Sequence, residues 1–117
     1  MHELSIATAI LDQLEGEARK RPGTRFTKVA VRVGELSGVD PDALSFSFEA
    51  LVKDSSWEPL ELEIQYLTRK QRCPSCRHEF GGSIFDTECP SCGELQTETV
   101  QGTELDIAWV EVEEVTA

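Results

Sequence analysis

Apolar residues recur at steps of three and four near the start of the chain. They are Leu4, Ala7, Leu11, Leu14 and Ala18, with Ile6 and Ile10 widening the stripe. This spacing places them on one face of an α-helix. Arg21, Pro22 and Gly23 follow, a combination that is typical of a helix end. The pattern therefore predicts an amphipathic helix over residues 4–18.

A second helix is predicted to begin at Asp40. The Asp40 carboxylate suits an N-cap, and Pro41 suits the first helical position, where its missing N–H needs no partner. Leu44, Phe48 and Leu51 follow with helical spacing. We expect these apolar residues to pack against the same core as the first helix.

Three further segments have the alternation or the composition of β-strands. In residues 26–36 one face carries Val29, Val31 and Val33, and the other carries Lys28, Ala30 and Arg32. Residues 60–66 alternate between apolar and polar side chains, which predicts a strand with one solvent-exposed face. Residues 105–115 are rich in Ile, Val and Trp and complete a three-stranded sheet.

Residues 68–98 differ from the rest of the chain. They contain all four cysteines but few large apolar residues, chiefly Phe80, Ile84 and Phe85. A segment of roughly thirty residues cannot bury a self-sufficient core and usually needs a metal or a crosslink. The predicted fold class is therefore α+β. Residues 1–67 and 99–117 form a small body of two helices on a three-stranded mixed sheet, and residues 68–98 form an inserted lobe.

The four cysteines form two Cys-Pro-Ser-Cys pairs that are separated by twelve residues, Cys73 with Cys76 and Cys89 with Cys92. A spacer of two residues lets both sulfurs of a pair face one point, as tetrahedral zinc requires. Two disulfides or a thioredoxin-like redox pair are the alternatives, but disulfides do not suit a reducing compartment and the redox motif needs a single pair at a helix start. The spacing predicts a structural zinc site in a zinc-ribbon-like lobe, with no open catalytic position.

Charge and length narrow the functional classes further. The 117 residues carry a formal net charge of −11, a field that repels nucleic acid and anionic membrane surfaces and attracts cations and basic proteins. No apolar run has the roughly 18 residues that a membrane span needs, and the start lacks the pattern of a secretory signal. We expect a cytoplasmic protein whose mature chain begins at Met1.

The start of the chain, Met1-His2-Glu3, offers a second group of metal ligands. The α-amine of Met1, the backbone nitrogen of His2 and its imidazole can close adjacent chelate rings in a plane that suits Ni(II) or Cu(II). Glu3 can add a further ligand. These nitrogens must shed protons to bind metal, so affinity should fall in mild acid. The alternative is a frayed terminus in which Glu3 only complements the helix dipole.

Several motifs together resemble the HypA/HybF family of nickel metallochaperones. They are Met1-His2-Glu3-Leu4-Ser5, Val33-Gly34-Glu35-Leu36-Ser37, the two Cys-Pro-Ser-Cys pairs, Glu104-Leu105-Asp106-Ile107 and Val110-Glu111-Val112-Glu113-Glu114. The resemblance covers nearly the whole chain in the same order. The first cysteine pair departs from the commoner Cys-Pro-x-Cys-Gly pattern because Arg77 follows Cys76.

The resemblance implies nickel delivery to the large subunit of [NiFe]-hydrogenase together with the GTPase HypB. It implies nickel ligation by Met1, His2 and Glu3, with Asp40 as an additional ligand, and zinc ligation by Cys73, Cys76, Cys89 and Cys92. Urease maturation factors remain open as partners, and so does the choice between monomer and homodimer.

Two other functional classes differ from a nickel carrier in what the sequence must supply. A zinc-ribbon adaptor that binds a protein partner and ignores nickel is the alternative. An enzyme is not expected, because the sequence has no Gly-x4-Gly-Lys-Ser/Thr phosphate loop and its two histidines, at positions 2 and 78, make no credible Ser/His/Asp set.

Overall fold

The computed structural model describes residues 2–83 and 85–115. The body contains α1 (Glu3–Arg19), β1 (Thr24–Gly34), a short 3-10 helix (Glu35–Ser37), α2 (Pro41–Val52), β2 (Glu61–Leu67) and β6 (Leu105–Glu114). The inserted lobe contains β3 (Lys70–Arg72), β4 (Glu79–Phe80) and β5 (Glu98–Gln101).

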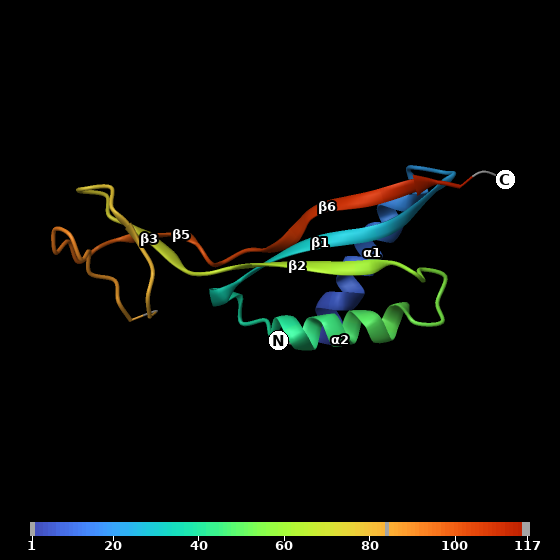
Figure 1. The fold of residues 1–117 in the computed structure, drawn as a ribbon, viewed down its shortest axis with the longest axis horizontal. Helices are drawn as coiled ribbons and strands as arrows, with labels where there is room; N and C mark the ends of the chain where they lie inside the picture. The colour runs from blue at the N-terminus through green and yellow to red at the C-terminus, as the bar shows by residue number, and fades with distance from the viewer. Residues whose placement is uncertain (1, 84, 116–117) are drawn as a thin grey trace.

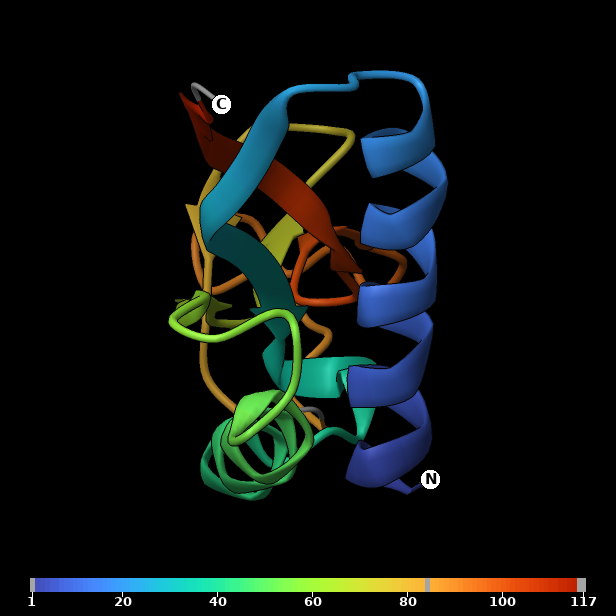
Figure 2. The ribbon, with the colours of Figure 1, turned by 90° about the vertical axis from the view of Figure 1, so that its right-hand side faces the viewer.

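The body is a mixed three-stranded sheet in the order β2-β1-β6. β1 runs parallel to β2 and antiparallel to β6, so β1 is the central strand. In Figure 2 α2 is seen end-on and α1 runs alongside the sheet. The lobe has its own sheet in the order β4-β3-β5. The predicted α+β class, with two helices, a mixed sheet and an inserted lobe, is confirmed.

The core lies between the two helices and one face of the sheet. Its buried members are Ala7, Ile10, Leu11 and Leu14 of α1, Leu44, Phe48 and Val52 of α2, Phe26, Val29, Val31 and Val33 of β1, and Val39 and Leu60 outside these elements. The predicted apolar stripes of both helices are thus confirmed, with one correction. Leu4 is 53% exposed because it lies in the first turn of α1, at the margin of the core.

Two expectations for β1 were wrong in detail. The alternation predicts Ala30 on the solvent face, but Ala30 is fully buried, because β1 is central and the longer side chains of Glu63 and Trp109 stand on both sides of it. Thr27 is an extra residue relative to β6, so Phe26 and Val29 face the same core although their numbers differ in parity. The strand also ends at Gly34, short of the predicted Leu36.

The molecule is elongated, with dimensions of 62 × 24 × 17 Å. Its radius of gyration is 18.3 Å, whereas a compact domain of this length has about 13 Å. Figure 1 shows why, since the lobe lies beyond one end of the body and the chain passes between them twice. The division of the chain at residues 68 and 98 stays a prediction.

We call the connection between body and lobe the neck and define it by Gly34, Glu35, Arg69 and Gly102. A Cβ at Gly34 would lie 2.0 Å from the Gly102 carbonyl oxygen, so only glycine fits there. The backbone N–H of Arg69 donates to Glu35 Oε1 at 2.8 Å. The buried Arg69 guanidinium then donates to the carbonyls of Gly82 and Asp86, which ties the neck to the lobe.

None of the helices within the described ranges has both the length and the apolar composition that a membrane crossing requires.

Candidate metal centres

The two cysteine pairs have the same local backbone. Cys73 accepts from the N–H of Arg77 and donates its own N–H to His78, at 2.8 and 2.9 Å. Cys89 does the same with Gly93 and Glu94, at 2.9 and 2.9 Å. These bonds curl each Cys-Pro-Ser-Cys segment into a knuckle whose two sulfurs point the same way.

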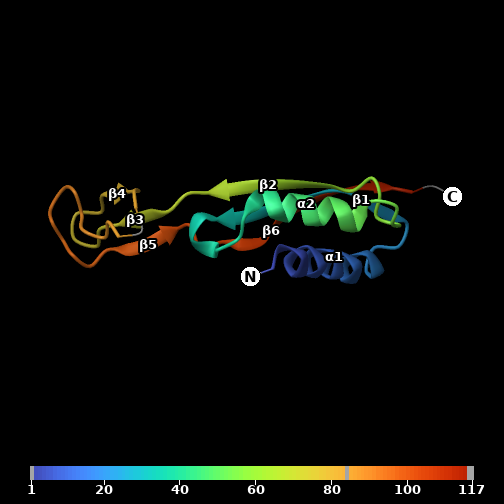
Figure 3. The same cartoon turned by 90° about the horizontal axis from the view of Figure 1, so that it is seen from below.

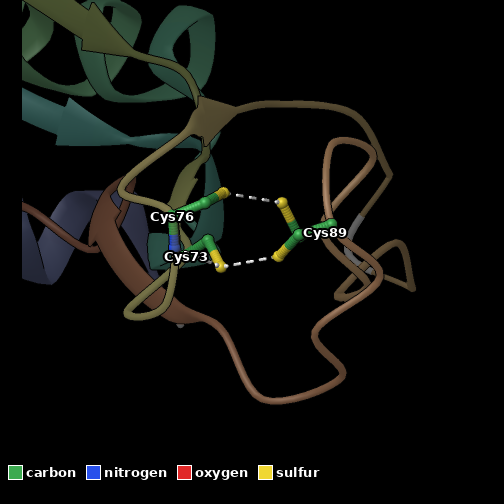
Figure 4. Close-up of side chains that lie close together, drawn as sticks. Cys73, Cys76 and Cys89 are labelled. Carbon is green, nitrogen blue, oxygen red and sulfur yellow. Dashed lines mark hydrogen bonds between the residues drawn. The ribbon is translucent and has the colours of Figure 1, made fainter.

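The knuckles face each other across the lobe. Figure 4 shows Cys73 and Cys76 pointing toward Cys89. The Sγ atoms of Cys73 and Cys92 are 3.5 Å apart, and those of Cys76 and Cys89 are 3.6 Å apart. All four sulfurs lie within 4.8 Å of one another. A zinc tetrahedron with bonds of about 2.3 Å has edges of about 3.8 Å, so the donor set fits zinc.

The ionisation of the thiols also favours a cation at this point. The backbone N–H of Cys76 is the main reason that the pKa of Cys73 is lowered to about 7. The backbone N–H of Glu94 lowers the pKa of Cys92, but the neighbouring cysteine thiols and lost hydration outweigh it and raise that pKa to about 12. A positive ion between the sulfurs would therefore favour the thiolate form of Cys92, which its surroundings otherwise disfavour.

The Glu94 carboxylate links the two knuckles. Its Oε2 accepts from the Ser75 hydroxyl at 3.0 Å, and its Oε1 accepts from the backbone N–H of Gln96 at 3.1 Å. The N–H of Gln96, followed by the Ser75 hydroxyl, lowers the pKa of Glu94. Sequence reasoning missed this link. The only available signal was the doubled Cys-Pro-Ser-Cys, which gives each knuckle a serine hydroxyl beside its sulfurs.

The start of α1 is the second candidate centre. His2 is exposed, has an extended backbone (φ −100°, ψ 117°) and is the N-cap of α1. Its carbonyl accepts from the N–H groups of Ser5 and Ile6, whereas the N–H of an N-cap residue lies outside the helical ladder. The backbone nitrogen and the imidazole of His2 thus both lie at the solvent-exposed end of the helix.

Asp40 lies beside this terminus. Its backbone N–H donates to Glu3 Oε2 at 3.3 Å, so the predicted pair of Glu3 and Asp40 is brought together. Its carboxylate also accepts from the N–H groups of Asp42 and Ala43, at 3.0 and 3.4 Å. This confirms the predicted N-cap of α2, which is the role the structure gives the Asp40 side chain.

The two centres differ in how far the described residues complete them. The four cysteines form a gathered set of possible ligands, whereas His2, Glu3 and Asp40 do not form such a cluster within residues 2–83 and 85–115. Met1, the other predicted nickel ligand, lies outside the described residues. The ligand assignments at both centres therefore stay predictions.

The fold and the two centres define a small, two-lobed metal-binding protein with a four-cysteine lobe and an exposed helix terminus. A family model described as hydrogenase/urease nickel incorporation, metallochaperone, hypA matches residues 1–112. The chain belongs to this HypA family, whose members are nickel metallochaperones and not enzymes.

Relatives cover the chain almost from end to end. The hydrogenase maturation factor HypA of Albidiferax ferrireducens is 36% identical over 113 residues, which are 97% of this chain and 100% of that protein. The protein of the same name from Geobacter metallireducens is 37% identical over 113 residues, with the same coverage.

Solved structures agree in fold. The solution structure of a HypA protein superposes with a TM-score of 0.69 and 26% identity over 95% of both chains. The nickel metallochaperone HypA from Helicobacter pylori superposes with a TM-score of 0.62 over 100% of both chains. Its 24% identity supports the likeness of fold alone.

Proposed function

We propose that this chain binds Ni(II) through the Met1 amine, His2 and Glu3, with Asp40 as an additional ligand. The observation that carries the proposal is the family match, which begins at residue 1 and so includes this terminus. The exposure of His2 and the contact between Glu3 and Asp40 support it. An exposed site suits a carrier, because ligand exchange with a recipient does not require the body to open.

The zinc assignment belongs to the same proposal. Cys73, Cys76, Cys89 and Cys92 hold one Zn(II), whose binding supplies about 10–16 kcal/mol of apparent free energy in sites of this kind. Four thiolates leave no open coordination position, so the ion stabilises the lobe and takes no part in nickel transfer.

Delivery goes to the large subunit of [NiFe]-hydrogenase in the cytoplasm. The hydrolysis of nucleotide that accompanies delivery comes from the GTPase HypB, because this chain has no phosphate-binding loop. The family description names urease beside hydrogenase, which supports urease maturation factors as further partners.

The test is a calorimetric titration of Ni(II) into untagged, zinc-loaded protein and into His2→Ala. We expect this variant to lose at least about tenfold in affinity, because nitrogen ligands dominate such a site. His78→Ala is the matched control, since His78 is the other histidine, is exposed in the lobe, and should leave the affinity unchanged. Asp40→Asn keeps the N-cap oxygen and tests whether the Asp40 charge contributes.

Identical isotherms for the native protein and His2→Ala would overturn the nickel site at this terminus. Only the absence of nickel binding in both proteins would favour the zinc-ribbon adaptor. Equal losses in His2→Ala and His78→Ala would also contradict the proposal, because they would place nickel at the lobe as well. An N-terminal tag must be absent, since it removes the amine.

A further inference from the structure

We infer that the free edge of β6 and the adjoining face of α1 form a docking surface for an extended segment of a partner protein. That segment alternates apolar with basic residues. The surface, which we call the β6 edge surface, consists of Ile6 and Ala9 of α1 and Leu105, Ile107, Val110 and Val112 of β6.

The four apolar residues of β6 share one face of the sheet. Their partners on β1 are Val33, Val31, Val29 and Phe26, in the order Leu105, Ile107, Val110 and Val112. All four partners are buried core residues. Ala108 is an extra residue relative to β1 and resets the alternation, so both halves of β6 turn their apolar side chains to the helix side.

Although these four side chains of β6 point to the helix side of the sheet, three of them remain largely exposed to solvent. Leu105, Val110 and Val112 are 38%, 38% and 41% exposed, and among the four only Ile107 packs against the core. A hollow of about 190 Å³ lies between α1 and the start of β6, with Ile6 and Ala9 on its helix side. In Figure 3 the start of β6 comes into view next to the N-terminal end of α1, and Figure 2 shows the rest of the strand running away from the helix. A row of apolar side chains beside a hollow is typical of an interaction site.

The backbone of β6 is unpaired on one side. In the order β2-β1-β6 it is the outer strand, and within the described ranges no strand pairs with its other edge. A segment that adds to this edge gains backbone hydrogen bonds along β6 and places alternate side chains on the apolar row.

The negative charge of the β6 edge surface favours a basic partner segment. Residues 104–115 carry five carboxylates and no basic residue, and residues 3–13 of α1 carry Glu3 and Asp12 and no basic residue. Arg32 and Arg25 pair with Asp106 and Glu113, which leaves three of the five without a basic partner in the described part of the chain. Pairing with a second copy would bring carboxylates against carboxylates. Lysine or arginine between apolar residues complements both sides.

The inference goes beyond nickel binding, and its test uses zinc-loaded protein without nickel, so either proposal can fail alone. The probe is a peptide that matches the ten residues of β6 in length and alternates valine with lysine. One control alternates valine with glutamate. The other control keeps the basic sequence but carries N-methyl groups on alternate backbone nitrogens, which removes the N–H donors along one edge of the extended peptide. NMR titration then follows the amide signals and amide exchange of β6.

We expect the basic peptide to bind, to slow amide exchange along β6 and to shift the signals of Ile6 and Ala9. Val110→Lys should weaken binding by about tenfold or more, because it removes an apolar contact and repels the peptide. Trp109→Lys adds the same charge at the next residue but on the opposite face, where Trp109 pairs with Ala30, and should change binding less than about twofold. Val112→Lys serves if Val110→Lys does not fold.

Three outcomes would overturn the inference. One is equal binding of the basic and acidic peptides, and another is undiminished binding of the N-methylated peptide. The third is slowed exchange along β6 that grows with protein concentration alone, because the occupant would then be a second copy.

Discussion

Arg77 and Gly93 hold equivalent positions after the two knuckles, and both have a left-handed backbone. Their φ angles are 65° and 80°. Glycine adopts this conformation freely, whereas a residue with a Cβ is strained by roughly 1–2 kcal/mol. The unusual Arg77 therefore keeps the knuckle geometry at a cost in stability and leaves the sulfur positions unchanged.

Replacing Arg77 with glycine should stabilise the zinc lobe by about 1 kcal/mol, because the strain disappears while the hydrogen bond from residue 77 to Cys73 is kept. The measurement is the chelator concentration that removes half of the zinc. Gly93→Ala is the mirror experiment and should lower that concentration. A lower concentration for Arg77→Gly would show that the arginine side chain contributes more than its backbone costs.

At the scale of elements, the helices were predictable and the strand irregularities were not. A capping aspartate, a following proline and apolar residues at helical spacing are local signals, so Asp40 and α2 could be read directly from the sequence. The bulges at Thr27 and Ala108 depend on how β1 pairs with β6, which is separated from it by most of the chain. The strands β3, β4 and β5 are too short to produce a period, which is why the lobe was predicted only from its cysteines.

The candidate sites also contain some parts that local sequence patterns predict and others that depend on contacts between distant segments. The cysteine spacing predicted the gathering of four sulfurs because each pair is closed by a local turn. By contrast, the contact between Glu3 and Asp40 joins the starts of two helices, and composition gives no signal for it. The sequence gives no signal for the burial of Arg69 either, because its carbonyl partners at Gly82 and Asp86 lie in an irregular loop.

Zinc binding to the lobe should release at least about two protons per ion at pH 7, because metal ligation requires thiolates. The raised pKa values of Cys76 and Cys92 keep these two thiols protonated in the metal-free lobe. Calorimetry in buffers of different ionisation enthalpy measures the number. Since protons compete with zinc, affinity should fall as the pH falls. Release of no protons would contradict the raised pKa values of Cys76 and Cys92.

At the scale of the whole molecule, the neck determines how the two lobes are held. Gly102 allows the two connecting segments to approach each other at Arg69, and Gly34 allows the end of β1 to approach Gly102. Glu35 holds one of these segments through the N–H of Arg69. The 3-10 helix that follows β1 continues this contact, since the N–H of Leu36 donates to the Gly102 carbonyl at 2.7 Å. The neck is therefore a short hydrogen-bonded joint and not a flexible linker.

Glu35→Ala should let the lobe move more freely relative to the body, because the Arg69 N–H loses its acceptor. The measurement is ¹⁵N relaxation, with separate rotational correlation times fitted for the body and the lobe. These times should diverge in the variant. Glu35→Gln retains an acceptor oxygen and should behave like the native protein. Unchanged relaxation in Glu35→Ala would assign the joint to the glycine contact alone.

The lobe lies within the connection between β2 and β6, so it lengthens the loop that must close before β6 can pair with β1. Residues 68–104 must close a long loop before the last strand can pair. A metal that joins the two knuckles removes about half of that loop, and halving a loop lowers its closure cost by about 0.6 kcal/mol. Newly made protein should therefore finish its sheet faster when zinc is abundant, which makes zinc supply an early step in producing a working nickel carrier.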